Sequence, residues 1–103
     1  FNTGNFVPGV PADFEVEIPT LVSKRGIQGI QTQGLPGPLQ AYLLRDRVAP
    51  VNVELEAYQT GSKELLLQLL LMDPWTRSEE QARALLEDIL ALPYHEEMRQ
   101  HYR

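Results

Sequence analysis

Two glutamates, Glu15 and Glu17, are the first candidates for catalytic chemistry in this sequence. They alternate with Phe14, Val16 and Ile18, so in a strand both carboxylates would project from the same face. Paired carboxylates can act as the acid and the base of glycoside hydrolysis. The wet face of a half-buried strand commonly carries such charges as well. We favour this second interpretation, a solvated face.

Metal and nucleophile chemistry is not indicated. His95 and His101 lie six residues apart, which does not place them on one face of a helix, and the chain contains no cysteine. It also contains no glycine-rich phosphate loop and no serine nucleophile motif. Residue types and spacing alone therefore predict no catalytic, cofactor or metal site in this chain.

Binding is the chemistry that the N-terminal segment could support. Residues 1–11 contain two glycines, two prolines and two asparagines around three apolar positions, which predicts an ordered loop. A structural connector is the commoner role for such a loop. Asn2 and Asn5 are its candidate substrate contacts, because a carboxamide can donate and accept hydrogen bonds to a sugar hydroxyl.

A short β-hairpin should follow this loop. The alternation over residues 14–18 predicts a strand, which continues in extended form to Val22. Residues 23–26 are polar and end in glycine, so they should turn the chain, and residues 27–32 should form the returning strand. Glycines and prolines over residues 34–38 then separate this part from the helices.

Three to five helices are predicted over residues 34–103. Pro50 should kink or restart the first of them, and Gly61 should form a corner before a helix that is capped by Ser62. Ser78 and Gln81 form a capping box, in which each side chain should bond the backbone N–H of the other residue. The fold class is therefore α+β, with a hairpin over residues 1–33 followed by a predominantly helical part.

Apolar stripes indicate which helix faces should be buried. One stripe is expected to lie in the core, and its members are Leu39, Tyr42, Val48, Val51, Leu55 and Tyr58. The helix over residues 62–72 is apolar on nearly every side, so it should be covered on several sides. Leu43, Leu44 and Leu67 fall outside the main stripes, and we expect them to contact another copy of the chain.

Length and charge limit the classes of function. At 103 residues and 11.7 kDa, the chain fits one domain, residues 1–103. Its net charge of -5 and scattered arginines disfavour a nucleic-acid partner. Its apolar runs are too short for a bilayer span, so we interpret it as soluble, cytoplasmic and without a membrane partner. Because it begins at Phe1 with a loop, we expect it to be a piece of something longer.

Three stretches of the sequence resemble the C-terminal part of glycoside hydrolase family 4. This family contains NAD-dependent glucosidases, galactosidases, galacturonidases and 6-phosphoglucosidases. The stretches cover residues 8–30 (PGVPADFEVEIPTLVSKRGIQGI), residues 34–74 (GLPGPLQAYLLRDRVAPVNVELEAYQTGSKELLLQLLLMDP) and residues 78–90 (SEEQARALLEDIL). The loop with Asn2, Gly4 and Asn5 is similar to a short asparagine- and glycine-bearing loop of the family. Around Asn5 and Gly9 the spacing departs from the commoner family pattern.

The resemblance implies an unusual hydrolysis. NAD oxidises the sugar at C3, a base removes the C2 proton, the aglycone leaves by elimination, water adds, and the cofactor returns its hydride. It further implies a divalent metal such as Mn²⁺, an upstream nucleotide-binding domain of the same polypeptide, a carbohydrate substrate and a homo-oligomer. This chain would form part of the α/β substrate domain of a Rossmann-type protein, supplying a wall of that domain and subunit contacts.

Two other classes of function are compatible with the residues. A free-standing helical module could recruit a partner protein through exposed apolar faces. A small sugar-binding domain could use the N-terminal loop. A glycine-rich strand-turn-helix encoded upstream of Phe1 would favour the hydrolase over both.

Overall fold

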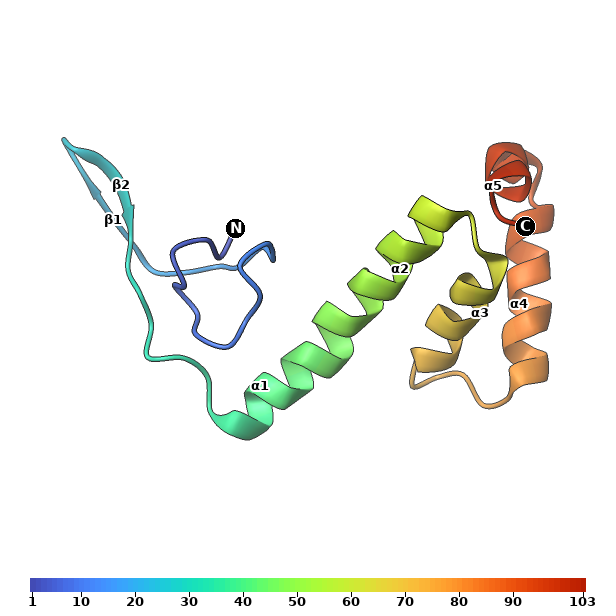
Figure 1. Cartoon of the computed structure of the whole chain (residues 1–103), viewed down its shortest axis with the longest axis horizontal. Helices are drawn as coiled ribbons and strands as arrows, with labels where there is room; N and C mark the ends of the chain where they lie inside the picture. The colour runs from blue at the N-terminus through green and yellow to red at the C-terminus, as the bar shows by residue number, and fades with distance from the viewer. The chain divides into compact units, whose positions relative to one another are not determined.

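The computed structural model describes all 103 residues, which form two compact units. The N-terminal unit is Phe1–Val48 and the helical unit is Ala49–Arg103, and each is described by itself here (Figure 1). A two-stranded hairpin followed by helices confirms the predicted α+β class. That the two units work as a single domain stays a prediction.

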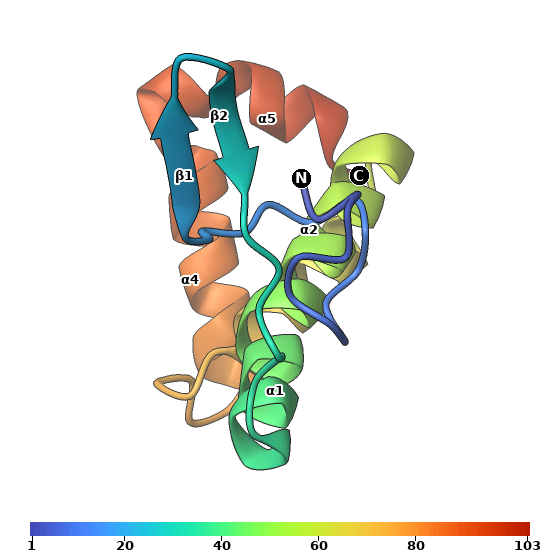
Figure 2. The same ribbon diagram turned by 90° about the vertical axis from the view of Figure 1, so that its left-hand side faces the viewer.

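The hairpin of the N-terminal unit pairs β1 (Thr20–Ser23) with β2 (Gly26–Gly29) in antiparallel register (Figure 2). Val22 lies opposite Ile27 across the two strands, and both side chains are exposed. Gly26 closes the turn with a φ of 106°, a left-handed conformation that glycine adopts at little cost. The predicted turn and the start of the returning strand are confirmed.

The first strand begins later than the sequence predicts. Phe14 does not enter the ladder, because its carbonyl accepts the backbone N–H of Asn2 at 2.9 Å. The ladder is extended instead by a bond from the N–H of Ile30 to the carbonyl of Pro19. Burial still alternates over residues 14–18, and Glu15 and Glu17 are exposed. The period-two pattern therefore identified the wet face correctly, but it could not identify the partner of the backbone.

Helix α1 (Gly37–Leu43) leads into a π-helical segment, η1 (Leu44–Val48), which completes the N-terminal unit. Helix α2 (Ala49–Thr60) then begins, with Pro50 in its first turn. An interior proline clashes with the carbonyl four residues earlier, and a π segment widens the backbone at that place. The predicted interruption at Pro50 is confirmed as a restart of the α-helix.

The helical unit consists of α2 and three further α-helices, α3 (Lys63–Met72), α4 (Glu79–Ala91) and α5 (Glu96–His101). A short 3₁₀ turn, η2 (Pro93–His95), joins the last two. Helix α3 contacts α2 on one side and α4 on another (Figure 1). The core of the unit consists of Leu67, Ala82, Leu86 and Leu90, and Leu66, Leu70 and Met98 pack against it.

Leu67 is at the centre of this core. Its exposed fraction is 2%, so it is not available on the surface of the unit for the contact with another copy that the sequence suggests. The rest of α3 is less covered than expected, since Leu71 and Met72 remain exposed. A helix that is apolar on nearly every side gives no sequence signal for the one face that meets its neighbour, and here that face is the one turned to α4.

The apolar stripe that the sequence predicts to be buried is mostly exposed within each unit. Only Val48 of its members is buried, whereas Leu39 and Tyr42 of α1 are about half exposed. Helix α2 instead buries Ala57 completely, and this residue lies on the side opposite Val51 and Leu55. Periodicity therefore identified the apolar face correctly, but it did not identify which part of the molecule, if any, packs against that face.

The predicted helix caps are confirmed with one change. The Ser62 hydroxyl accepts the N–H of Leu65 at 3.2 Å, and the Ser78 hydroxyl accepts the N–H of Gln81 at 3.1 Å. The Gln81 carboxamide, however, accepts the N–H of Arg77 at 2.8 Å and not that of Ser78. The two side chains still accept backbone N–H groups at the start of α4, but the group that Gln81 accepts belongs to Arg77, one residue before the predicted Ser78.

Gly61 forms the corner between α2 and α3. Its φ is 66°, and a Cβ built there would lie 2.7 Å from the carbonyl oxygen of His101. Gly61→Ala is therefore expected to lower the free energy of unfolding by about 1–3 kcal/mol, from backbone strain and this contact together. Denaturant unfolding followed by helical circular dichroism measures the effect. Gly37→Ala is the control, because nothing lies near its Cβ position, and an equal, small effect of both changes would contradict the prediction.

Candidate functional site

The N-terminal loop, residues 1–11, is organised around the side chain of Asn2. The Asn2 Nδ2 group donates to the carbonyls of Val7 at 3.0 Å and Val10 at 2.8 Å, and Oδ1 accepts the N–H of Val7 at 3.0 Å. The backbone N–H of Asn2 donates to the carbonyl of Phe14, and the carbonyl of Asn2 accepts the N–H of Asn5, each at 2.9 Å. Asn2 is 1% exposed. Its carboxamide is buried and fully used, so its placement does not fit the expected contact with a sugar.

The local sequence explains why the loop closes in this way. Val7 and Val10 are buried beside Asn2, and a turn brings the N–H of Val10 to the carbonyl of Val7. Gly9 has a φ of 87°, and a Cβ at this position would overlap the carboxamide of Gln40 from α1. Gln40 donates to the Gly9 carbonyl at 3.1 Å. The loop is thus fixed from inside by Asn2 and from outside by α1.

Asn5 is the exposed asparagine of the loop. Its φ is 50°, a left-handed conformation that asparagine tolerates better than most residues. Its backbone carbonyl accepts a hydrogen bond from Gln31 at 3.0 Å, while its side chain is on the surface. Asn5 remains the candidate substrate contact, and that role stays a prediction.

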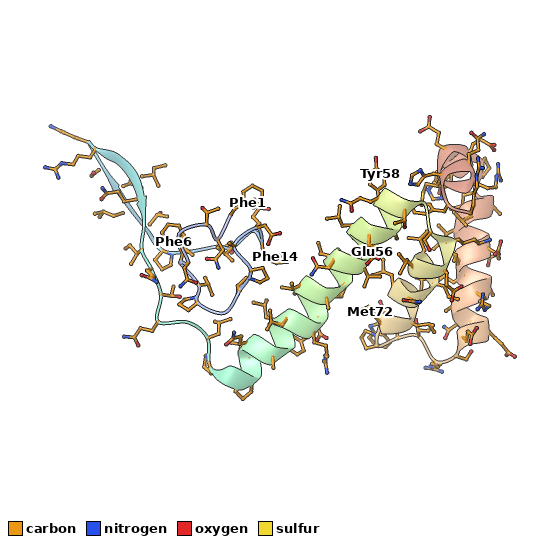
Figure 3. All side chains as sticks on the ribbon, viewed as in Figure 1. Phe1, Phe6, Phe14, Glu56, Tyr58 and Met72 are labelled. Atoms are coloured by element: carbon orange, nitrogen blue, oxygen red, sulfur yellow. The ribbon has the colours of Figure 1, made fainter.

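The segment after β2 holds the other side of the loop. Thr32 directs both its N–H and its hydroxyl to the carbonyl of Phe6, at 2.8 and 2.9 Å. Figure 3 shows the aromatic rings of Phe1, Phe6 and Phe14 around the same loop. Gln31 and Thr32 are not apparent as site residues from the sequence, because their bonds to the loop span 26 residues. The result is a fixed polar surface that includes Asn5 and Gln31.

The titratable groups elsewhere in the N-terminal unit do not form a catalytic pair. Arg45 bonds Asp46 through Nε–Oδ1 at 2.6 Å and Nη2–Oδ2 at 3.0 Å, and it lies 5.6 Å from the ring centre of Tyr42. This hydrogen bond lowers the pKa of Asp46 and raises the pKa of Arg45. A carboxylate kept charged by an adjacent guanidinium is a poor proton donor.

A groove of about 340 Å³ in the helical unit is lined by Lys63, Glu64, Leu67, Arg83, Leu86, Glu87 and Arg103. Two of its cations are already paired, since Lys63 contacts Glu87 at 2.6 Å and Arg83 contacts Glu79 at 2.7 Å. Two leucines of the core form its apolar lining. Two of the three cations in the lining are therefore neutralised by ion pairs, and Arg103 is the third.

The two histidines are held separately. The Nδ1 atom of His95 lies 2.7 Å from the carbonyl of Ile89, and the Nε2 atom of His101 lies 2.7 Å from the carbonyl of Tyr58. No three side chains of the His, Cys, Asp and Glu types gather where they could hold a metal ion. None of the helices is long and apolar enough to span a membrane.

Comparison with known proteins gives the functional context. Residues 1–76 match the model of the family 4 glycosyl hydrolase C-terminal domain. An α-glucosidase from Erwinia rhapontici is 34% identical over 68 residues, which are 66% of this chain and 15% of that protein. The matched segment therefore corresponds to a small share of the length of this relative.

Proposed function

The chain belongs to glycosyl hydrolase family 4, whose C-terminal domain it carries, and from this premise we propose that it acts as one part of an enzyme that cleaves glycosidic bonds. The observation that supports the proposal is the match over residues 1–76, which includes the N-terminal loop, the hairpin and helices α1 to α3. The name of the relative from Erwinia rhapontici points in the same direction.

In this proposal the N-terminal loop forms part of the wall of the substrate domain. Its conformation is fixed by the buried Asn2, so polar groups on its surface are held in place before a ligand arrives. Asn5 and Gln31 present carboxamides that suit the hydroxyls of a carbohydrate. A wall of this kind binds and orients substrate but transfers no proton.

The residues of this chain do not fit a resident metal or nucleotide. Its acidic and histidine side chains are dispersed, and its sequence has no glycine-rich nucleotide loop. We propose that NAD and a divalent metal such as Mn²⁺ are held by the remainder of the hydrolase polypeptide, including an upstream nucleotide-binding domain. The chemistry of oxidation, elimination, addition and reduction would take place there, in a cytoplasmic enzyme.

We propose also that the intact enzyme is a homo-oligomer. Leu43 and Leu44 remain the contact candidates, because both are only half-buried in the N-terminal unit. Leu67 leaves this set, since its side chain is enclosed by the core of the helical unit. Sedimentation velocity of the intact enzyme with and without Leu44→Glu tests the contact.

The proposed function predicts that the isolated chain hydrolyses no aryl glycoside when NAD, Mn²⁺ and a reductant are supplied. A chromogenic release assay measures this, and turnover by the purified chain would contradict the proposal. A second experiment tests for recovered activity. The chain is added to the Erwinia rhapontici α-glucosidase from which the matching segment has been deleted. Recovery of hydrolysis is expected there, and a mixture that binds without recovering hydrolysis would count against the proposed function.

A further inference from the structure

Helix α2 has an apolar face that the helical unit leaves largely exposed, and the packing on it is that of His101 on the ring of Tyr58, with 5.3 Å between the ring centroids. Val51, Leu55 and Tyr58 form this face, which we call the α2 seam, and their exposed fractions are 46%, 51% and 64%. They follow the spacing i, i+4 and i+7, so they lie along one side of the helix. The completely buried Ala57 lies on a different side of the helix. Figure 3 shows Tyr58 near the C-terminal end of α2. The helix is thus apolar on two sides, and the unit itself uses one of them.

A second copy of this chain is a poor match for the seam. Stable interfaces bury on the order of 800 Å² per partner, and three side chains on a helix about 18 Å long offer much less. Glu54 flanks the seam, and α2 contains no basic residue, so a second α2 would bring carboxylates together without a cation. The helical unit carries ten acidic and five basic residues, so its net charge of -5 equals that of the whole chain. Repulsion between two such units also opposes self-pairing.

A partner that is covalently joined to the chain does not need so large an interface. Covalent connection supplies a high effective concentration, so a small apolar strip can stay docked that could not hold two free molecules together. The relative from Erwinia rhapontici has 85% of its length outside the matched segment, which makes the remainder of a family 4 hydrolase several times larger than this domain. Helix α2 lies inside the family match, whereas α4 and α5 lie outside it.

We propose that the α2 seam is the surface on which the remainder of the hydrolase polypeptide, the hydrolase body, docks against this domain. The inference rests on the proposed function. The docking element of the body presents apolar side chains to Val51, Leu55 and Tyr58, with Lys or Arg side chains beside Glu54. This assigns to α2 the role of connecting the substrate-domain wall to the catalytic part of the enzyme.

The test measures binding of this chain to the Erwinia rhapontici α-glucosidase that lacks the matching segment, by isothermal titration calorimetry. Leu55→Glu is expected to weaken binding at least tenfold. Leu85→Glu is the matched control, because Leu85 is 45% exposed on α4, outside the family match, and this change should leave binding unaltered. Both variants should keep the helical circular dichroism and melting temperature of the parent, since neither residue is in the core.

Several results would overturn the inference. These are no binding by the parent chain, binding by Leu55→Glu at the parent affinity, or an equal loss with Leu85→Glu. A dimer of the parent chain that Leu55→Glu abolishes would identify a second copy as the occupant instead. If a Leu55→Glu variant of undiminished affinity recovers hydrolysis, this inference is overturned and the proposed function stands. If the parent chain binds through the seam but hydrolysis is not recovered, the inference stands and the proposed function is overturned.

Discussion

Asn2→Asp is expected to open the N-terminal loop while the helical unit stays folded. The two side chains have nearly the same shape, so no packing is lost, and Oδ1 can still accept the N–H of Val7. The change replaces the donor to the carbonyls of Val7 and Val10 with a charged oxygen. Both carbonyls would then face a buried carboxylate. The Val7 carbonyl keeps the N–H of Val10 as a donor, but the Val10 carbonyl is left unsatisfied, which costs about 1–3 kcal/mol, and the buried charge adds to this cost. We expect a loss of about 3 kcal/mol or more.

Amide hydrogen exchange is the appropriate measurement, because it reports the two units separately. The amides of Val7 and Val10 should lose protection in the variant, while that of Leu86 in the helical core should not. Asn5→Gly is the control: Asn5 is exposed with a φ of 50°, so glycine there should leave the loop unchanged or slightly more stable. Unchanged exchange at Val7 in Asn2→Asp would show that the carboxamide does not hold the loop.

Features encoded by neighbouring residues could be predicted from the sequence. Gly61 and Ser62 end one helix and begin the next through bonds within a few residues, and both act as predicted. Gly26 and the polar residues before it place the hairpin turn for the same reason. Turns and caps depend on local backbone chemistry, so a short stretch of sequence contains most of what determines them.

Features that depend on distant partners could not be predicted in the same way. The carboxamides of Asn2 and Asn5 are chemically identical, yet Asn2 is buried because Val7, Val10 and Phe14 close around it, whereas Asn5 stays outside. Residues 14–18 have the alternation of a strand, but the backbone of Phe14 bonds the N-terminal loop instead of a neighbouring strand. The pattern indicates which side chains avoid water, whereas the tertiary structure determines which groups the backbone hydrogen-bonds.

The same limit applies to the helical faces. A stripe over Val51, Leu55 and Tyr58 predicts burial, and within its own unit the structure leaves it open. Leu67 is surrounded in sequence by other leucines, so periodicity does not distinguish it from Leu66 or Leu69, yet it alone on α3 is fully enclosed. Which apolar face becomes core depends on where α4 packs, and this is decided by complementarity between two helices rather than by either sequence alone.

Leu67→Ala should consequently be among the most destabilising single changes in the helical unit. Truncating a fully buried leucine removes its transfer free energy and leaves a cavity, at a total cost of about 2–5 kcal/mol. Ala82, Leu86 and Leu90 form the other wall of that cavity, and the half-buried Leu66 and Leu70 can collapse into it only in part. We expect a loss of about 3 kcal/mol in urea unfolding followed by helical circular dichroism.

Leu71→Ala is the matched control for this prediction, since it makes the same chemical change on the same helix at a residue that is 43% exposed. It should cost no more than about 1 kcal/mol, because a half-exposed side chain gives up little burial and alanine favours the helix. A clear separation of the two variants would establish that α3 packs on α4 through the Leu67 face. If both leucines cost the same, Leu67 would be accessible after all, and it would return to the set of residues that could contact a second subunit.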